Sequence, residues 1–224
     1  KAKYKDAEFI DAKGSIIMPA FINVHEHIYS AMARGFSING YNPKGFLEIL
    51  DGMWWTIDRN LTLEQTKQSA MATYIESIKN GVTTVFDHHA SFGHIEGSLF
   101  AIEEAAKTMG VRTSLCYEVS DRDGEAKSKA SIKENLDFIK HAMADKTDMI
   151  KGMMGMHASF TISDKTMEAC MKDLPDGIGC HIHVAEGIED LHACLKDHGK
   201  RVVDRLFDWK VLGPHTLLVH CIYV

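Results

Sequence analysis

Six apolar runs of strand length recur along the chain, and stretches with apolar residues at every third or fourth position separate them. The runs cover residues 15–24, 82–89, 111–119, 148–157, 178–186 and 215–224. Most of them are apolar throughout, which is typical of strands covered on both faces. Strands that alternate with helices predict a parallel sheet in an α/β fold. The pattern fits a doubly wound sheet or most of a (β/α)8 barrel.

The stretches between the runs carry signals for the ends of helices. A capping-box pattern, in which Ser or Thr precedes Glu or Gln by three residues, occurs at Thr62–Gln65 and at Ser131–Glu134. We therefore expect one helix to begin at each pattern. Asn80 with the following glycine, Pro175 and Gly199 predict where three of the helices end.

Composition and charge exclude several classes of partner. Apolar residues make up 45% of the 224-residue chain, charged residues make up 25%, and the formal net charge is -6. No basic block is present, so neither nucleic acid nor an anionic membrane is an expected partner. No apolar run approaches the ~20 residues that span a bilayer, and no signal-peptide pattern occurs. We expect a small-molecule substrate instead.

The cysteines indicate a reducing compartment. Their number is odd and no C-x-x-C motif occurs, which is typical of free thiols in a cytoplasmic protein. The five positions are Cys116, Cys170, Cys180, Cys194 and Cys221.

The first run leads directly into His25-Glu26-His27. Alternate residues of a strand point to the same face, so His25 and His27 project together while Glu26 turns away. The carboxyl ends of parallel strands line the active site of α/β folds. Two imidazoles that converge there suit a divalent metal ion, although a pair of hydrogen-bonded structural histidines fits the motif equally well.

Histidines also end most of the other runs, which strengthens the metal interpretation. His183 ends the fifth run and shares its face with His181, and Glu186 follows at a position from which it could exchange protons with a metal-activated water. His157 ends the fourth run and His220 lies in the sixth. Asp87, His88 and His89 end the second run, and we expect Asp87 and His88 to be structural.

Nucleophile-based and dinucleotide-based chemistry are less well supported. Cys221 follows His220 directly, so their side chains point to opposite faces and cannot form a Cys–His pair. No G-x-S-x-G motif is present, and no G-x-G-x-x-G follows the first run.

Several of these segments resemble one family. "MPAFINVHEH" is similar to the P-G-F-[IV]-[ND]-x-H-x-H signature of the amidohydrolase superfamily, and "HIHVAE" is similar to the H-x-H-x-x-E motif of its aminohydrolase and chlorohydrolase branch. "TTVFDHHAS", "CYEVSDRDG" and "HASFTIS" resemble the SsnA-type aminohydrolases most closely. The resemblance covers nearly the whole chain in the same order. Ala20 replaces the usual glycine of the first motif.

The resemblance implies a role for each matching residue. His25, His27 and His183 match metal ligands, and Glu186 matches the residue that shuttles protons. His220 matches a histidine that contacts the hydrolytic water or the substrate. His157 matches a histidine that often contacts substrate. No lysine stands at the end of the fourth run to carry a second ion, so the resemblance implies one divalent metal ion, with zinc favoured over iron.

The resemblance also implies the domain organisation. Residues 1–15 would be an edge of the family's β-sandwich, and residues 16–224 would be strands one to six of a TIM-like (β/α)8 barrel. We expect the chain to be a segment of a longer protein, because the family's last metal ligand, an aspartate, would lie beyond residue 224.

The expected activity is metal-dependent hydrolysis. The resemblance implies deamination of an amidine-like, guanidine-like or heterocyclic amine by a metal-bound hydroxide. Dechlorination or amide cleavage at the same site is an alternative, and an inactive metal-binding fragment or paralogue is another. Trp54 and Trp55 follow the first run and could cover the site or contribute to a contact in a homo-oligomer. Aromatic residues that only cap a helix would explain them equally well.

Overall fold

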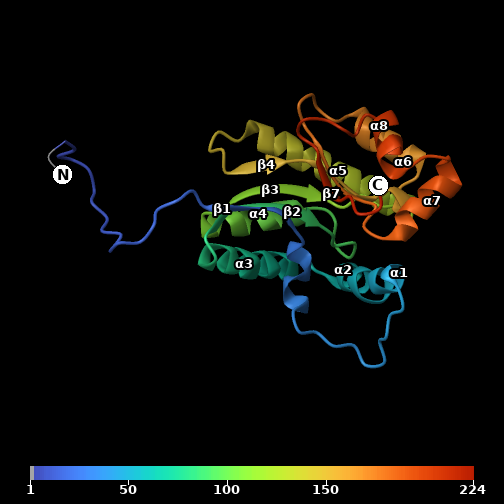
Figure 1. Ribbon diagram of the computed structural model, residues 1–224, viewed down its shortest axis with the longest axis horizontal. Coiled ribbons are helices and arrows are strands. Elements are labelled where there is room, and N and C mark those ends of the chain that lie inside the picture. Colours follow the sequence, from blue (N-terminus) through green and yellow to red (C-terminus); the bar gives the residue numbers. More distant parts are fainter. Residues whose placement is uncertain (1–2) are drawn as a thin grey trace.

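The computed structural model describes residues 3–224 and contains a parallel sheet flanked by helices (Figure 1). The strands are β1 (Phe21–Glu26), β2 (Val82–His89), β3 (Arg112–Tyr117), β4 (Ile150–Gly152), β5 (Met154–Ala158), β6 (Cys180–Val184) and β7 (Leu217–His220). They pair in the order β1-β2-β3-β4 and β5-β6-β7, and every pair is parallel. Strands that follow one another in space as they do in sequence belong to a barrel, because a doubly wound sheet reverses its order at a switch point.

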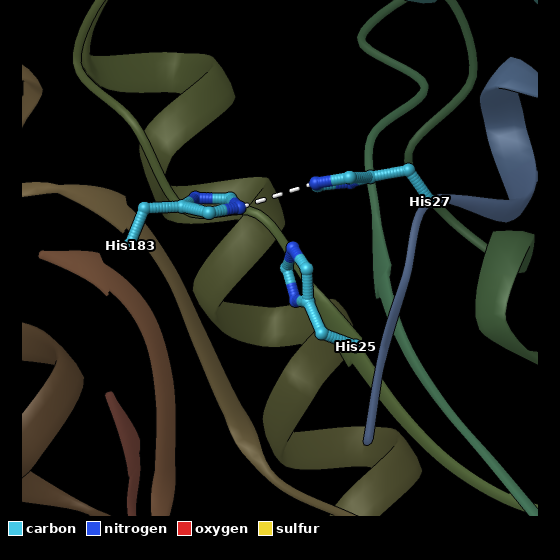
Figure 2. Close-up of side chains that lie close together, drawn as sticks. All are labelled: His25, His27 and His183. Atoms are coloured by element: carbon cyan, nitrogen blue, oxygen red, sulfur yellow. Dashed lines mark hydrogen bonds between the residues drawn. The ribbon is translucent and has the colours of Figure 1, made fainter. Parts of the chain in front are cut away.

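The two groups of strands are joined into one surface at β3 and β5. The backbone N–H of Val119, just after β3, donates to the oxygen of Gly155, and the N–H of His157 donates to the oxygen of Val119. All strands therefore place their carboxyl ends at one edge. There β1 and β6 bring three histidines close together (Figure 2).

The six expected strands are all present, with one interruption. The fourth run is divided at Met153 into β4, which pairs with β3, and β5, which pairs with β6. Met153 still donates its N–H to the oxygen of Leu115, so the break marks the point where the run leaves one strand group and joins the other.

The prediction that the strands are covered on both faces is confirmed for the central strands and is wrong for the first and last ones. Every residue of β5 and β6 is buried. In β1, Phe21, Ile22 and Val24 are 59%, 59% and 55% exposed. Among residues 3–224, β1 pairs only with β2 and β7 only with β6, and no strand of the other group adjoins them.

The helices fill the connections between strands. They are α1 (Phe46–Ile49), α2 (Trp55–Asn60), α3 (Leu63–Lys79), α4 (Ser98–Met109), α5 (Glu125–Ala144), α6 (Asp164–Lys172), α7 (Ile188–His198) and α8 (Val202–Asp208). Two 3-10 segments, Ile28–Ala33 and Ser159–Thr161, and a π-helical turn, Leu50–Trp54, complete the set among the described residues.

Helix α3 begins and ends where the sequence predicts. The Thr62 hydroxyl accepts from the backbone N–H of Gln65, and the Gln65 side chain accepts from the backbone N–H of Thr62, so the capping box is complete. Asn80 forms the C-cap. Gly199 likewise caps α7 in a left-handed conformation, with φ of 66°.

The second predicted capping box is wrong. Ser131 and Glu134 lie inside α5, which begins six residues earlier at Glu125. The Ser131 hydroxyl donates to the oxygen of Lys127, and the Glu134 carboxylate accepts from the backbone N–H groups of Gly97 and Leu99. Glu134 therefore caps the neighbouring helix α4, which has no side-chain cap of its own.

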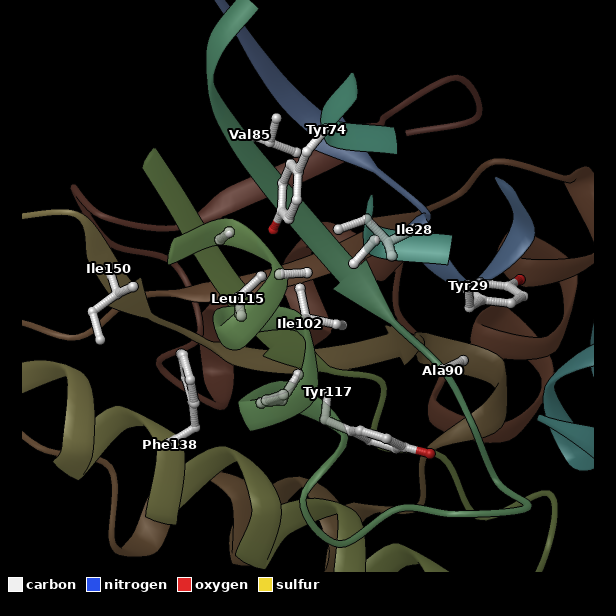
Figure 3. Packing of buried hydrophobic residues seen from close by; sticks show 14 of the residues in the cluster. Ile28, Tyr29, Tyr74, Val85, Ala90, Ile102, Leu115, Tyr117, Phe138 and Ile150 are labelled. Atoms are coloured by element: carbon white, nitrogen blue, oxygen red, sulfur yellow. The ribbon is translucent and has the colours of Figure 1, made fainter. Parts of the chain in front are cut away.

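Two hydrophobic clusters hold the helices on the sheet. The first packs α3, α4 and α5 against β2 and β3, and Tyr74, Leu115 and Phe138 are fully buried in it (Figure 3). The second packs α6, α7 and α8 against β5 and β6 around Met156 and Ile182. Large-to-small substitutions in such clusters typically cost about 2–5 kcal/mol.

Residues 3–20 form no helix or strand and extend away from the sheet (Figure 1). The interpretation of residues 1–15 as a sandwich edge stays a prediction, and residues 1 and 2 lie outside the described part. No helix in residues 3–224 has the length and apolar character needed to cross a bilayer.

Candidate active site

A cavity of about 250 Å³ opens at the carboxyl edge of the sheet. All six residues predicted for the site line it: His25, His27, His157, His183, Glu186 and His220. The six come from four different strands or the residues just after them. A larger hollow of about 880 Å³ shares Trp55 with this cavity but is lined by none of the six.

His27 and His183 face each other across the cavity. Their Nε2 atoms lie 3.2 Å apart, and Figure 2 shows the two rings approaching from β1 and β6. Nδ1 of His27 lies 2.9 Å from the backbone oxygen of His88, and Nδ1 of His183 lies 2.9 Å from the backbone oxygen of His157. A carbonyl oxygen only accepts, so each Nδ1 carries the proton of its ring.

The Nε2 lone pairs of His27 and His183 therefore point at each other. In a neutral imidazole with its proton on Nδ1, Nε2 is an acceptor, and two acceptors at this distance need a cation between them. A second proton on His183 is disfavoured, because burial first and the neighbouring histidines second hold its pKa well below 6.5. A metal-ligating histidine typically donates its other N–H to a carbonyl, as both rings do here.

His25 completes the group. Its Nδ1 lies 2.9 Å from Nε2 of His181, and its Nε2 is buried without a hydrogen-bond partner among the described residues. Burial, followed by the charges of His27, His181 and His220, lowers the pKa of His25 to about 3. The ring is therefore neutral and keeps a lone pair available for a ligand.

The donor set fits a divalent metal ion. His25, His27 and His183 each offer a nitrogen, and the three ligand atoms lie within 4.8 Å of one another. Neutral imidazole nitrogens suit zinc, and three protein ligands with an open position are typical of a catalytic zinc site.

Glu186 and His220 lie beside this group. Oε2 of Glu186 is 3.3 Å from Nε2 of His220, and both side chains remain partly accessible, at 37% and 28%. Ala185, directly before Glu186, has φ of 46°, and His220 has φ of 71°. Left-handed backbone at non-glycine residues persists only where the surroundings enforce it, and it concentrates at functional sites.

Asp190 enforces the turn that carries Glu186. This buried carboxylate accepts from the backbone N–H of Ala185 at 2.9 Å and from the backbone N–H of Phe160 at 2.9 Å. One side chain of α7 thus fixes two loops that border the cavity. This role of Asp190 was not predicted from sequence, because no local pattern shows which loop a helix residue contacts.

His157 and the two tryptophans form the opposite wall. Nδ1 of His157 lies 2.8 Å from the hydroxyl of Thr161, and its ring centroid lies 6.0 Å from that of Trp55. Trp54 and Trp55 both line the cavity, which agrees with a covering role for these residues. His157 is buried, and burial lowers its pKa.

At the end of β2, Asp87 has a structural role, as expected. The Asp87 carboxylate accepts from the backbone N–H of Ile28 at 2.7 Å and so anchors the turn after β1. His89 lies 2.9 Å from the hydroxyl of Ser91. His88 also lies next to the group of metal-ligand candidates, since its ring centroid is only 4.4 Å from that of His183.

Two residues of this region were not assigned a role from sequence. Glu118 follows β3 directly, is buried, and lines the same cavity as the histidines. His181 contacts His25 through a ring nitrogen. Glu118 could have been found, since a charged residue just after an apolar run obeys the same strand-end rule as the histidines.

The model of the amidohydrolase family matches residues 16–224. A 5'-deoxyadenosine deaminase of Methanosarcina mazei is 31% identical over 231 residues, which cover 100% of this chain and 50% of that protein. The chain spans about half the length of the curated relatives that it matches.

Solved structures share the fold. The guanine deaminase of C. acetobutylicum with bound guanine superposes with a TM-score of 0.85 at 18% sequence identity. The match covers 100% of this chain and 54% of the guanine deaminase chain. An adenosine deaminase of Xanthomonas campestris with bound zinc superposes with a TM-score of 0.75 at 17% sequence identity. The match covers 92% of this chain and 45% of the adenosine deaminase chain.

Proposed function

The chain belongs to the amidohydrolase family, and on that premise we propose that it carries the metal site and the proton-transfer pair of a hydrolytic deaminase. The proposed substrate is a heterocyclic amine with an amidine-like carbon, of the adenosine type. The similarity to a 5'-deoxyadenosine deaminase supports this class over chlorinated heterocycles or amides. The observation that carries the proposal is the pair of Nε2 atoms of His27 and His183, which face each other at 3.2 Å beside Glu186 and His220.

His25, His27 and His183 would hold one divalent ion, with zinc favoured. When bound, such an ion lowers the pKa of water from 15.7 towards ~7 and polarises the substrate. The hydrogen bonds from His27 to the oxygen of His88 and from His183 to the oxygen of His157 would fix the orientation of these rings.

Glu186 would act as the general base and then as the general acid. Its carboxylate takes a proton from the attacking water as the carbon–oxygen bond forms. It gives that proton to the departing nitrogen as the carbon–nitrogen bond breaks, so that ammonia leaves. The second proton of the water passes from the added oxygen to the ring nitrogen, and a carbonyl remains. His220, with Nε2 3.3 Å from the Glu186 carboxylate, would orient the water and stabilise developing negative charge.

His157 and the tryptophans would bind the substrate. A planar heterocycle can stack on the indoles of Trp54 and Trp55 while His157 donates or accepts a hydrogen bond. A cavity of about 250 Å³ suits a single purine-sized ring better than a large conjugate.

Ammonia release tests the proposal. The zinc-loaded protein is incubated separately with 5'-deoxyadenosine, adenosine, guanine and a chlorinated triazine, and ammonia and chloride are measured. We expect ammonia from at least one aminated substrate and no chloride from the triazine. Chloride release without ammonia would contradict deamination and support the dechlorination alternative.

A further inference from the structure

His88 has a buried lone pair that no protein group satisfies. Its side chain is fully buried at the end of β2, and Nε2 lies 3.0 Å from the backbone oxygen of Met156. Because a carbonyl oxygen only accepts, Nε2 carries the proton and Nδ1 is bare. Nδ1 has no hydrogen-bond partner among the described residues.

Glu118 faces this lone pair with a carboxylate. Oε2 of Glu118 lies 3.7 Å from Nδ1 of His88, and Oε1 lies 3.5 Å from a guanidinium nitrogen of Arg122. Glu118 is only 3% exposed, so its carboxylate and the bare His88 nitrogen meet in a buried place. A carboxylate and a bare imidazole nitrogen are both acceptors, and their approach in a buried place calls for a cation.

The separation matches two ligands of one metal ion. A proton shared directly between nitrogen and oxygen would bring the atoms to about 2.7–2.9 Å, well below the 3.7 Å found here. Two ligands that each lie about 2.1 Å from a tetrahedral ion are ~3.4 Å apart. His183 supplies a third donor, since the ligand atoms of His88, Glu118 and His183 all lie within 4.8 Å of one another.

The surrounding charges favour a cation at this position. Arg122 is the nearest positive group, and it also contacts the carboxylates of Asp58 and Asp123. One guanidinium group is therefore shared by three carboxylates, including that of Glu118. Nearby Arg59 is itself paired with Asp123.

We propose that His88, Glu118 and His183 form a second seat for a divalent cation, alternative to the seat formed by His25, His27 and His183. His183 has one free nitrogen, because its Nδ1 is bonded to the oxygen of His157, so a single ion uses one seat or the other. The second seat consists of buried residues only, whereas His25 and His27 are half-buried. It shares His183 with the metal site of the proposed function and rests on that proposal to this extent.

Zinc content per chain tests the second seat without any activity assay. Wild type, His25→Ala/His27→Ala and the same double variant with Glu118→Gln are saturated with zinc, dialysed and measured by elemental analysis. We expect about one ion per chain in wild type and in the double variant, and about a tenfold loss when Glu118 is also replaced. The matched control adds Asp123→Asn instead, which removes a carboxylate from the same arginine and should leave the zinc in place.

Two results would overturn the second seat: a folded double variant without zinc, or a triple variant that keeps as much zinc as the double one. Circular dichroism establishes that each variant is folded. If the double variant does not fold, the single variant His27→Gln replaces it in the same comparison, with the same expectations. Wild-type protein without zinc would instead contradict the metal site of the proposed function, so the two failures are distinguishable.

Discussion

Nε2 of His27 and Nε2 of His183 lie 3.2 Å apart, although the two residues are 156 positions apart in sequence. Each ring has its proton committed to a backbone oxygen, His27 to that of His88 and His183 to that of His157. The folded chain therefore holds two acceptors face to face. A cation between the two nitrogens makes this arrangement favourable.

Replacing Glu186 with Gln should remove turnover and leave metal binding intact. The amide keeps the shape of the side chain but cannot take a proton from water, so we expect a loss on the order of 10²–10⁴ in kcat for ammonia release. Zinc per chain should not change, because Glu186 is not one of the three grouped ligands. The matched control is Glu189→Gln, which alters a nearby carboxylate outside the cavity lining. Near-normal turnover of the Glu186 variant would refute its role.

The strand-end histidines were predictable because two simple rules determine their position. Residues at alternate positions of a strand share a face, and parallel strands end at one edge, so His25, His27 and His183 had to converge once the six runs were recognised. Glu186 and His220 follow from the same rules. The capping box at Thr62 was predictable because its partners lie within one helical turn.

Contacts between distant segments were not predictable in this way. Glu134 matches a local capping pattern, yet its carboxylate binds the start of α4, and only the packing of α4 on α5 makes that contact available. The exposure of Phe21 in β1, which pairs only with β2 among residues 3–224, does not follow from its own sequence. Glu118 resembles any polar residue after a strand until the fold places His88 next to it.

Removing the Asp190 carboxylate should destabilise the protein. Asp190→Ala leaves the backbone N–H groups of Ala185 and Phe160 without their acceptor in a buried place, which costs about 3 kcal/mol. Urea unfolding followed by circular dichroism measures the change in the free energy of unfolding. Asp190→Asn retains one acceptor oxygen and should lose less. A cost equal in both variants would mean that the hydrogen bonds are not the source of the effect.

Glu134→Ala should weaken the start of α4. The carboxylate accepts from the N–H groups of Gly97 and Leu99, both at 2.9 Å, and an N-terminal cap is worth about 1 kcal/mol. Hydrogen exchange of the first turn of α4 should become faster while the exchange of α3 stays the same. Lys133→Ala, a substitution of the adjacent exposed residue, serves as the control. Equal exchange rates at α4 in wild type and Glu134→Ala would contradict the capping role.

Asp121 should make stability depend on pH in acid. Burial raises the pKa of its carboxyl group, but hydrogen bonds from Ser163, Thr166 and Ser128 outweigh burial and bring the pKa below its ordinary value of 3.8. A lowered pKa in the folded state adds stability above the ordinary value, and this contribution is lost as the pH falls through the folded value.

The variant Asp121→Asn tests this pH dependence. It should be less stable than wild type at neutral pH, and the difference should shrink as the pH falls below the ordinary value of 3.8 and through the lower folded value, where the wild-type carboxyl becomes protonated. Urea unfolding of both proteins over that range gives the comparison. A difference in unfolding free energy that stays constant down to strong acid would show that the Asp121 carboxylate is not the responsible group.

Metal content per chain tests the central claim most directly. Purified wild type and His25→Ala/His183→Ala are saturated with zinc, dialysed and analysed for bound metal, with circular dichroism to establish that both are folded. The account predicts about one ion per wild-type chain and almost none in the variant, which lacks His183 and so disrupts both seats. A folded wild-type chain that binds no zinc, or a variant that binds as much as wild type, would contradict it.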